Sequence, residues 1–185
     1  MLCVTRTGFE LVVKMITISK PKSEDAQAIH EVIKASWYAA YIDTKIGITK
    51  EDIDASYTPE IEEGQIKALR FRAENPKGED ISLVAKDNER VVGFIRFKIH
   101  PDSVEWLSLY VHPDYFGKGI GTVLWEESSK LLPEGKPVTA EVATYTKAVD
   151  FYKKLGFVDT GERAAENVMK GSKIPIPLTK LILNR

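Results

Sequence analysis

The stretch from Leu109 to Ser128 constrains the fold more than any other part of the sequence. It reads LYVHPDYFGKGIGTVLWEES, in which an extended run ends at a proline and three glycines precede a helical pattern. Glycine is the most costly ordinary residue to order, so Gly117, Gly119 and Gly121 indicate a tight turn or the close approach of a ligand. A strand, a turn and a helix in this order predict a crossover to a parallel strand.

Hydrophobic periodicity and turn residues predict the remaining elements. Apolar residues at helical spacing predict a helix with Ser23 as its cap and further helices over 50–57, 59–74, 117–132 and 146–156. Apolar runs bounded by turn residues predict strands over 15–20, 81–86, 90–99, 104–111, 138–142, 157–162 and 176–183. This order predicts an α/β fold, with a single mixed, mostly antiparallel sheet flanked by helices on both faces.

Length and composition fit one domain. The chain has 185 residues, of which 43% are hydrophobic and 29% charged, and this balance suffices for one globular core. A clean strand pattern starts at Met15, so residues 1–14 are expected to be an extension outside a domain that covers 15–185. Arg6 and Glu10 interrupt the apolar run near the start, which argues against a signal peptide or a membrane span. We therefore expect a cytoplasmic protein.

The charged and metal-binding residue types exclude several functional classes. A formal net charge of -1 gives no overall basic surface, so nucleic acid is a poor candidate partner. Cys3 is the single cysteine, and the three histidines are scattered, so neither a disulfide nor a metal site is expected. Of these histidines, His30 is expected on the exposed side of its helix, and His112 is expected to serve the turn before Pro113.

The glycine turn has the chemistry of a phosphate cradle. Several backbone N–H groups can converge at a helix N-terminus, and the glycines at 117, 119 and 121 would let an anion approach them. A glycine-rich turn without a ligand is the alternative interpretation. A P-loop is excluded because its Gly-Lys-Ser/Thr sequence is absent, and a Rossmann fingerprint is excluded because Leu124 stands where its third glycine would be.

Two segments together resemble the signatures of the GNAT superfamily of N-acetyltransferases. The glycine turn is similar to the acetyl-CoA signature, Gln or Arg, two residues, Gly, one residue, then Gly or Ala, with Phe116, Gly119 and Gly121 at those positions. The downstream segment TKAVDFYKKLGF resembles a second signature, a helix with Phe-Tyr that ends in Gly-Phe. The order of elements matches the family from about residue 15 to 185, so the resemblance implies the GNAT fold.

The resemblance implies acetyl-CoA as acetyl donor, no metal, and a set of coenzyme-binding residues. That set is Leu109, Tyr110, Val111, Phe116, Gly117, Lys118, Gly119, Ile120, Gly121, Thr122, Tyr145, Ala148, Phe151 and Tyr152. Two positions depart from the family pattern. Phe116 replaces Gln or Arg, which leaves the backbone amides of 116–121 and the charge of Lys118 to hold the pyrophosphate. Tyr145 stands where many relatives have Asn.

Acetyl transfer to an amine requires a base, an oxyanion donor and an acid. Glu105 is the candidate base, because its position fourteen residues before Gly119 is similar to that of a catalytic glutamate in some histone-acetylating relatives. By strict strand alternation it shares a face with Leu107, Leu109 and Val111, where its carboxylate would be partly desolvated. A solvated carboxylate at a strand end is the alternative, and many relatives use chains of water instead.

The remaining catalytic roles come from the resemblance. It implies that Tyr152 is the acid that donates to the coenzyme A sulfur, whereas helical spacing alone is equally consistent with packing in the core. It also implies that backbone N–H groups near 109–111 are the oxyanion donors.

The acceptor is an amine whose identity the sequence leaves open. Trp37, Tyr38 and Tyr41 lie in SWYAAY, which resembles a segment of bacterial polyamine acetyltransferases. A following acidic run could attract a polycation or could be a solvated helix face; its members are Glu51, Asp52, Asp54, Glu60, Glu62 and Glu63. The alternatives are another small amine such as an amino sugar, a peptide N-terminus or lysine as acceptor, and a non-catalytic acyl-CoA-binding module. Relatives often form a homodimer, but no segment here identifies an interface.

Overall fold

The computed structural model describes residues 16–166 and 175–185, and only the backbone of 164–166. The strands are β1 (Ile16–Ser19), β2 (Asp80–Asp87), β3 (Arg90–Ile99), β4 (Val104–Val111), β5 (Val138–Ala143), β6 (Val158–Glu166) and β7 (Ile176–Leu183). The helices are α2 (Ala26–Ala40), α3 (Lys50–Ala55), α4 (Pro59–Glu74), α5 (Ile120–Ser129) and α6 (Ala148–Lys154), with the 3₁₀ turns η1 (Ser23–Asp25) and η2 (Pro113–Tyr115). The predicted extension at 1–14 lies outside the described residues.

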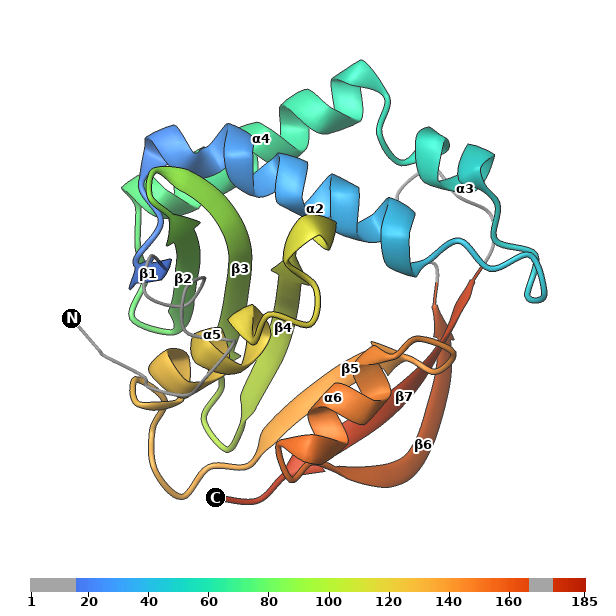
Figure 1. The fold of residues 1–185 in the computed structure, drawn as a ribbon. Helices are drawn as coiled ribbons and strands as arrows, with labels where there is room; N and C mark the ends of the chain where they lie inside the picture. The colour runs from blue at the N-terminus through green and yellow to red at the C-terminus, as the bar shows by residue number, and fades with distance from the viewer. Residues whose placement is uncertain (1–15, 167–174) are drawn as a thin grey trace.

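One seven-stranded sheet has the order β1-β2-β3-β4-β5-β7-β6. Every neighbouring pair is antiparallel except β4 and β5, which are parallel. The glycine turn and α5 form the crossover between those two strands (Figure 1). The predicted parallel crossover and the mixed, mostly antiparallel sheet are therefore confirmed.

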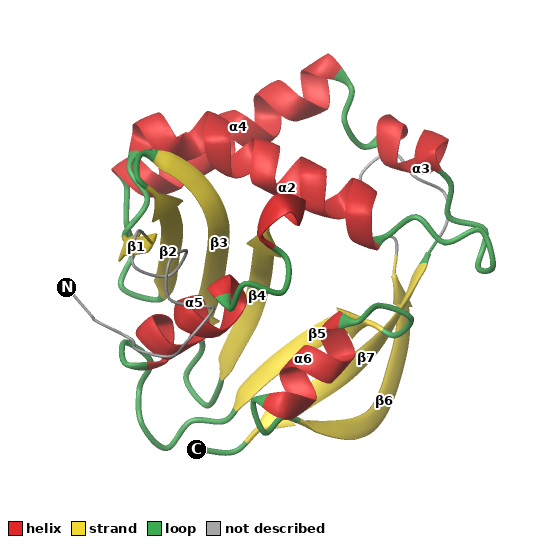
Figure 2. Cartoon of the chain, viewed as in Figure 1, coloured by secondary structure: helices red, strands yellow, loops and turns green. Residues whose placement is uncertain are grey.

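Helices cover both faces of the sheet, as Figure 2 shows. One face carries α2 and α4 over β2 and β3, where Ile29 and Val32 pack with Phe94. The other face carries α5 and α6, where Leu124 and Tyr152 pack with strand residues of the largest apolar cluster. Burial of these side chains is the main source of stability, at roughly 25 cal/mol for each Å² of apolar surface removed from water.

Two predicted helix starts were wrong by a few residues. Ser23 does not cap the first helix, because it is the first residue of η1, and the Lys22 N–H donates instead to the carboxylate of Asp25 at 2.9 Å. Asp25 is buried and forms an ion pair with Lys86 at 2.7 Å. The helix α5 begins at Ile120 and not at residue 117, because Gly117 and Gly119 have left-handed φ angles that interrupt helical geometry.

A β-bulge in β4 overturns the predicted strict alternation of that strand. Phe97 pairs with Trp106 and Arg96 pairs with Ser108, so Leu107 is an extra residue. Trp106, before the bulge, and Leu109, after it, both face the cluster under α5 and α6. Glu105 therefore faces the opposite side of the sheet from Leu109, and the prediction that they share a face was wrong.

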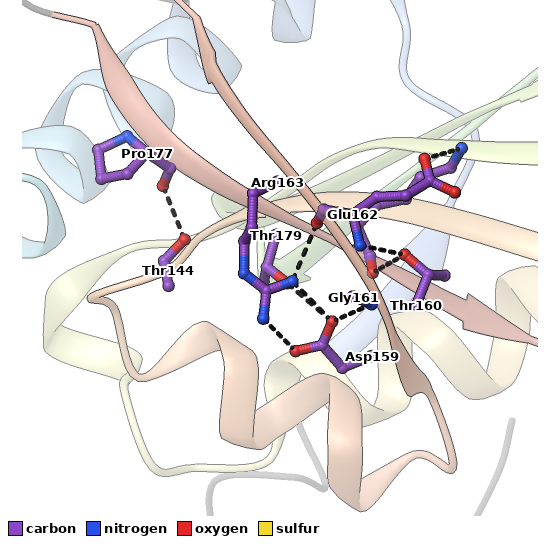
Figure 3. A network of polar contacts seen from close by, with 9 residues as sticks. Thr144, Asp159, Thr160, Gly161, Glu162, Arg163, Pro177 and Thr179 are labelled. Carbon is purple, nitrogen blue, oxygen red and sulfur yellow. Dashed lines mark hydrogen bonds and ion pairs between the residues drawn. The ribbon is translucent and has the colours of Figure 1, made fainter.

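The strand β6 carries a larger irregularity, which Figure 3 shows. Its pairing with β7 shifts between Asp159 and Arg163, and Gly161 takes a left-handed φ of 80°. The carboxylate of Asp159 accepts hydrogen bonds from the Gly161 N–H at 2.9 Å and from both terminal nitrogens of Arg163 at 2.8 and 2.9 Å. It also accepts one from Thr179 at 3.2 Å. The Asp159 carboxylate thus pairs the Gly161 N–H within the irregularity, and the Glu162 N–H donates to Thr160 Oγ1 at 3.2 Å.

Candidate active site

The glycine turn presents a row of free backbone donors. Gly117 and Gly119 have φ of 74° and 78°, a backbone conformation that favours glycine, and Gly119 is the N-cap of α5. A helix leaves its first four N–H groups without intrahelical partners. Here the N–H groups from 119 to 122, together with that of Gly117, have no acceptor within the described part of the chain. They are available to an anion.

Two amides of the predicted cradle are already used within the protein. The N–H of Phe116 donates to Pro113 O at 3.0 Å, and that of Lys118 donates to Tyr115 O at 3.3 Å. The expectation that all amides from 116 to 121 are free was therefore wrong at these two positions. The Phe116 side chain is exposed, and the Lys118 ammonium lies 4.8 Å from the centre of the Tyr115 ring.

Close packing under α5 fixes the position of the cradle. A Cβ added at Gly93 of β3 would lie 2.9 Å from Leu124 Cδ1 and 3.0 Å from Ile120 Cγ2. Only glycine therefore lets the helix approach β3 this closely. At Gly121 an added Cβ would lie 3.4 Å from the Phe151 ring, so the first turn of α5 also sits against α6. The sequence analysis missed the role of Gly93.

The strands β4 and β5 separate beyond the bulge, and Figure 1 shows them diverging toward α2. They pair only from Val104 to Trp106 on the β4 side. The His112 N–H donates to Val92 O at 2.8 Å, which places the 92–112 pair in hydrogen-bonded register with β3. By alternation along an antiparallel ladder, the amides of Val111 and Leu109 point away from β3 and toward the gap.

The carbonyl group of Val111 is held by α2. The Ser36 hydroxyl lies 2.7 Å from Val111 O and 2.8 Å from Val32 O, and its single proton can be donated to either. Ser36 is buried, so this contact joins the middle of α2 to the open end of β4. No local pattern in the sequence pointed to this residue.

Tyr152 lies on the α5 and α6 side of the gap. It is 7% exposed, and its ring packs edge-on against Trp106 with the centroids 4.7 Å apart. Burial, and to a smaller extent the neighbouring Tyr110, raises the pKa of the Tyr152 hydroxyl well above its usual value. The hydroxyl therefore keeps its proton at neutral pH, as a proton donor must. Ala148 is the first residue of the same helix, and Phe151 of this helix packs against the first turn of α5 at Gly121.

Glu105 lies on the opposite side of the gap. Its Oε2 is 3.1 Å from His100 Nε2, and 45% of its side chain is exposed, which favours the alternative of a solvated carboxylate at a strand end. It borders a polar pocket of about 220 Å³ on the face that α5 and α6 leave open; the lining residues are His100, Ser103, Glu105, Thr139, Glu141 and Lys180. His100 and Glu105 are neighbours because the four-residue turn HPDS, residues 100–103, reverses the chain between them. Its carboxylate is therefore accessible from this face.

Aromatic residues of α2 border the end of the gap. The Trp37 and Tyr41 rings stack with centroids 4.4 Å apart, and the Tyr145 hydroxyl donates to Tyr41 O at 3.1 Å. Burial raises the pKa of Tyr145 to about 12 and that of Tyr41 well above its usual value. Tyr38 turns instead toward α3 and donates to Asp54. The predicted acceptor residues thus divide, with Trp37 and Tyr41 near the gap and Tyr38 engaged by α3.

The acidic run between 51 and 63 is largely paired within the protein. Asp54 lies 2.7 Å from Lys50, Glu63 lies 2.7 Å from Lys67, and Glu62 forms an ion pair with Lys34. Asp52 accepts the Thr49 N–H at 2.9 Å and caps α3. These contacts favour the interpretation of the run as a structural surface rather than as an attractant for a polycation.

His30 is a further correction. It is 2% exposed and its Nε2 lies 2.8 Å from Gln65 Oε1 on α4, so the prediction of an exposed histidine was wrong. Among residues 16–166 and 175–185, no three histidine, cysteine or acidic side chains form a group that could hold a metal ion. The helices in the same residues include none with the length and hydropathy needed to cross a membrane.

These features fit the acetyl donor that the sequence implied. The free amides at 117 and 119–122 suit a pyrophosphate, because an anion gains both hydrogen bonds and the positive end of the α5 dipole. The gap between β4 and β5 offers the unpaired N–H groups of Leu109 and Val111 to an extended chain. A bound donor would supply a thioester carbonyl and a thiolate leaving group in that gap.

Comparison with known proteins agrees with this geometry. Residues 78–159 match the family described as acetyltransferase (GNAT) domain. A peptidyl-lysine N-acetyltransferase, YjaB of Salmonella typhimurium, is 29% identical over 170 residues, which cover 91% of this chain and 98% of that protein. A spermidine N(1)-acetyltransferase of Thermoplasma acidophilum is 29% identical over 146 residues, which cover 77% of this chain and 88% of that protein.

A solved structure has the same fold. The PaiA N-acetyltransferase of Thermoplasma acidophilum, crystallised in complex with coenzyme A, superimposes with a TM-score of 0.69 at 23% identity. The match covers 92% of this chain and 99% of that one. The overall fold therefore has a counterpart in a solved acetyltransferase.

Proposed function

Because this chain belongs to the GNAT superfamily of N-acetyltransferases, we propose that it transfers the acetyl group of acetyl-CoA directly to a primary aliphatic amine. Its relatives act, by their names, on spermidine and on peptidyl-lysine. Both acceptors present a primary amine on a flexible alkyl chain, and this shared group is the acceptor chemistry that we assign.

The gap between β4 and β5 is the observation that carries the proposal. It joins two faces of the sheet with different chemistry, since Tyr152 lies on the α6 side and Glu105 on the open side. A donor held at the glycine turn would reach the gap beside Tyr152, while an amine would enter from the face with the polar pocket. This arrangement supports direct transfer, because the two reactants meet without an acyl-enzyme step.

Each residue then has one task. The N–H groups of Leu109 and Val111 polarise the thioester carbonyl, and Glu105, directly or through water, takes a proton from the acceptor ammonium. A nitrogen–carbon bond forms and the carbon–sulfur bond breaks, with its electron pair left on sulfur. The Tyr152 hydroxyl gives its proton to that sulfur, and the second proton that the nitrogen loses restores the hydroxyl, directly or through water.

The test is release of free thiol from acetyl-CoA with separate acceptors. Spermidine, N-acetyl-lysine methylamide, a lysine-containing peptide and a peptide with only a free N-terminus would each be added alone. We expect release with acceptors that carry an alkylamine, and the ratio of kcat/KM between spermidine and the lysine compounds assigns the preferred class.

Two other outcomes would contradict the proposal. Release with the N-terminal peptide alone would overturn the assigned acceptor, because a peptide α-amine is a primary amine that lies on no flexible alkyl chain. Coenzyme A binding by calorimetry without thiol release from any amine would indicate a binding module without catalysis.

A further inference from the structure

A buried hydrogen-bond donor at the gap has no partner. The Nε1 atom of Trp37 has essentially no solvent-accessible surface and no hydrogen-bond partner among the described residues. Buried polar groups in proteins are almost always paired, so an unpaired donor requires an explanation. Its neighbour in the sequence, Ser36, is paired with β4 as described above.

The contacts of Trp37 place this donor between the two separated strands. Its ring packs on the cluster that includes Ala143 at the end of β5, and Tyr145 packs on the same cluster. On the other side lies the hydroxyl of Tyr110 of β4, whose pKa is raised by burial and lowered to a smaller extent by the Trp37 indole. The two groups are neighbours, but they form no hydrogen bond of ordinary length and angle.

The rest of the structure holds the indole in this position. Stacking on Tyr41 fixes the ring plane, with an angle of 12° between the two rings. Ser36 ties the preceding residue to Val111 O at 2.7 Å, next to the amides that face the gap. These contacts hold the ring in place, but the Nε1 atom is covered, so a ligand reaches it only when a neighbouring side chain such as that of Tyr110 moves aside.

The chemistry of the donor restricts its partner. An indole N–H donates only, and an alkylammonium has no lone pair to accept its proton. A carbonyl oxygen accepts hydrogen bonds, and the proposed reaction brings one carbonyl into the gap. The acceptor amine is therefore an unsuitable partner, and the thioester carbonyl is a suitable one.

We propose that Trp37 Nε1–H donates a hydrogen bond to the thioester carbonyl oxygen of the bound acetyl donor, beside the N–H groups of Leu109 and Val111. This inference rests on the proposed function, because it requires an acetyl thioester in the gap. It makes Trp37 a catalytic residue that stabilises negative charge developing on that oxygen, in addition to any role in lining the acceptor path.

The first test follows the indole N–H signals of the wild-type chain by ¹H–¹⁵N NMR. Trp37→Phe identifies the Trp37 signal, and Trp106 is an internal reference because its Nε1 already donates to Ser108 O at 3.0 Å. Acetyl-CoA is expected to move the Trp37 signal downfield, while coenzyme A with a free thiol leaves it nearly unchanged. In both titrations the amide signals of Gly119 and Gly121 report whether the ligand is bound.

Two results would overturn the assignment. If the glycine amides move and the Trp37 signal does not, the indole has no contact with the ligand. If acetyl-CoA and coenzyme A move it equally, its partner is a carbonyl of the pantetheine chain. Both results come from binding alone, so they are separate from a failure of the proposed acetyl transfer.

Kinetics of Trp37→Phe give the second test. Loss of one oxyanion donor is expected to lower kcat by about 100- to 1000-fold with KM for both substrates nearly unchanged. An unchanged kcat with a raised KM for the amine would contradict the proposal, because it would assign Trp37 to the acceptor. If the variant does not fold, the wild-type NMR titration still decides, with the Trp37 signal assigned through its contacts to the Tyr41 ring.

Discussion

The sheet is interrupted in two places, and the two places differ in whether the backbone N–H groups left out of the ladder have partners. Between β4 and β5 the pairing stops after Trp106, and the N–H groups of Leu109 and Val111 are left facing a gap. Between β6 and β7 the pairing shifts near Gly161, but the Gly161 N–H donates to Asp159 and the Glu162 N–H donates to Thr160. An irregular strand is therefore not itself a sign of function. What distinguishes the β4–β5 region is that its polar groups remain available.

The comparison leads to opposite expectations for substitutions in the two regions. Changes around the β4–β5 gap should alter the reaction while the fold survives. Changes around the β6–β7 bulge should alter stability while the reaction of the folded protein is preserved.

The largest effect is expected for Tyr152→Phe at the gap. Loss of the proposed acid should lower kcat about 1000-fold, within the range typical of general acid catalysis. The dissociation constant for acetyl-CoA should change less than about twofold, since Phe keeps the ring that packs on Trp106. Steady-state kinetics and calorimetry measure the two quantities. An unchanged kcat would remove Tyr152 from the mechanism.

Glu105→Gln should have the next largest effect. Loss of the proposed base is expected to lower kcat/KM about 100-fold at pH 7. Since the carboxylate is nearly half exposed, the thermal midpoint should hardly move. His100→Gln is the matched control, because it changes the neighbour of Glu105 while the carboxylate stays, and its effect should be much smaller. Equal losses of kcat/KM in both variants would contradict the role of Glu105 as base, because they would indicate that the His100–Glu105 contact only maintains the structure of the hairpin.

Gly93→Ala tests whether close packing of α5 on β3 positions the phosphate cradle. The added methyl would overlap Leu124 and Ile120, so α5 must shift, at a cost of about 1–3 kcal/mol. The expected result is a roughly tenfold weaker binding of coenzyme A, measured by calorimetry. Gly64→Ala is the control, because an added Cβ there meets nothing within 4 Å in the interior of α4. It should stabilise the fold slightly, by about 0.5–1 kcal/mol, with unchanged binding.

Asp159→Asn should have the smallest effect on the reaction. A hydrogen bond from Arg163, followed by one from the Gly161 N–H, lowers the pKa of Asp159 to about 2. The unfolded value is about 3.9, so the charged carboxylate stabilises the fold above that pH and the contribution is lost as the pH falls toward 2. The variant should have a lower Tm at pH 7, and its difference from the wild type should shrink between pH 4 and 2. Exposed Glu134→Gln is the control, and kcat at 25 °C should be unchanged in both.

Local patterns predicted the elements well because each element is specified by neighbouring residues. The strands at 90–99 and 104–111 and the helix at 59–74 lie where periodicity placed them. The glycine turn was also predictable, since positive φ angles and free amides follow from a few adjacent residues.

The errors concern contacts that join distant residues. The bulge at Leu107 exists only through the pairing of β4 with β3, and it reversed the predicted face of Glu105. His30 is buried because Gln65, thirty-five residues later, provides its partner. The same limit applies to the site, where Ser36 contacts Val111 and Gly93 contacts α5, both of which are distant in the sequence.

The pairing of carboxylates near α3 and α4 has a consequence for encounter in solution. Asp54, Glu62 and Glu63 each lie against a lysine of this chain, so their charges largely cancel at a distance. At physiological ionic strength the field of such pairs is further screened within about 8 Å. A cationic acceptor would then arrive by ordinary diffusion with little electrostatic steering, and its association rate would vary only weakly with added salt.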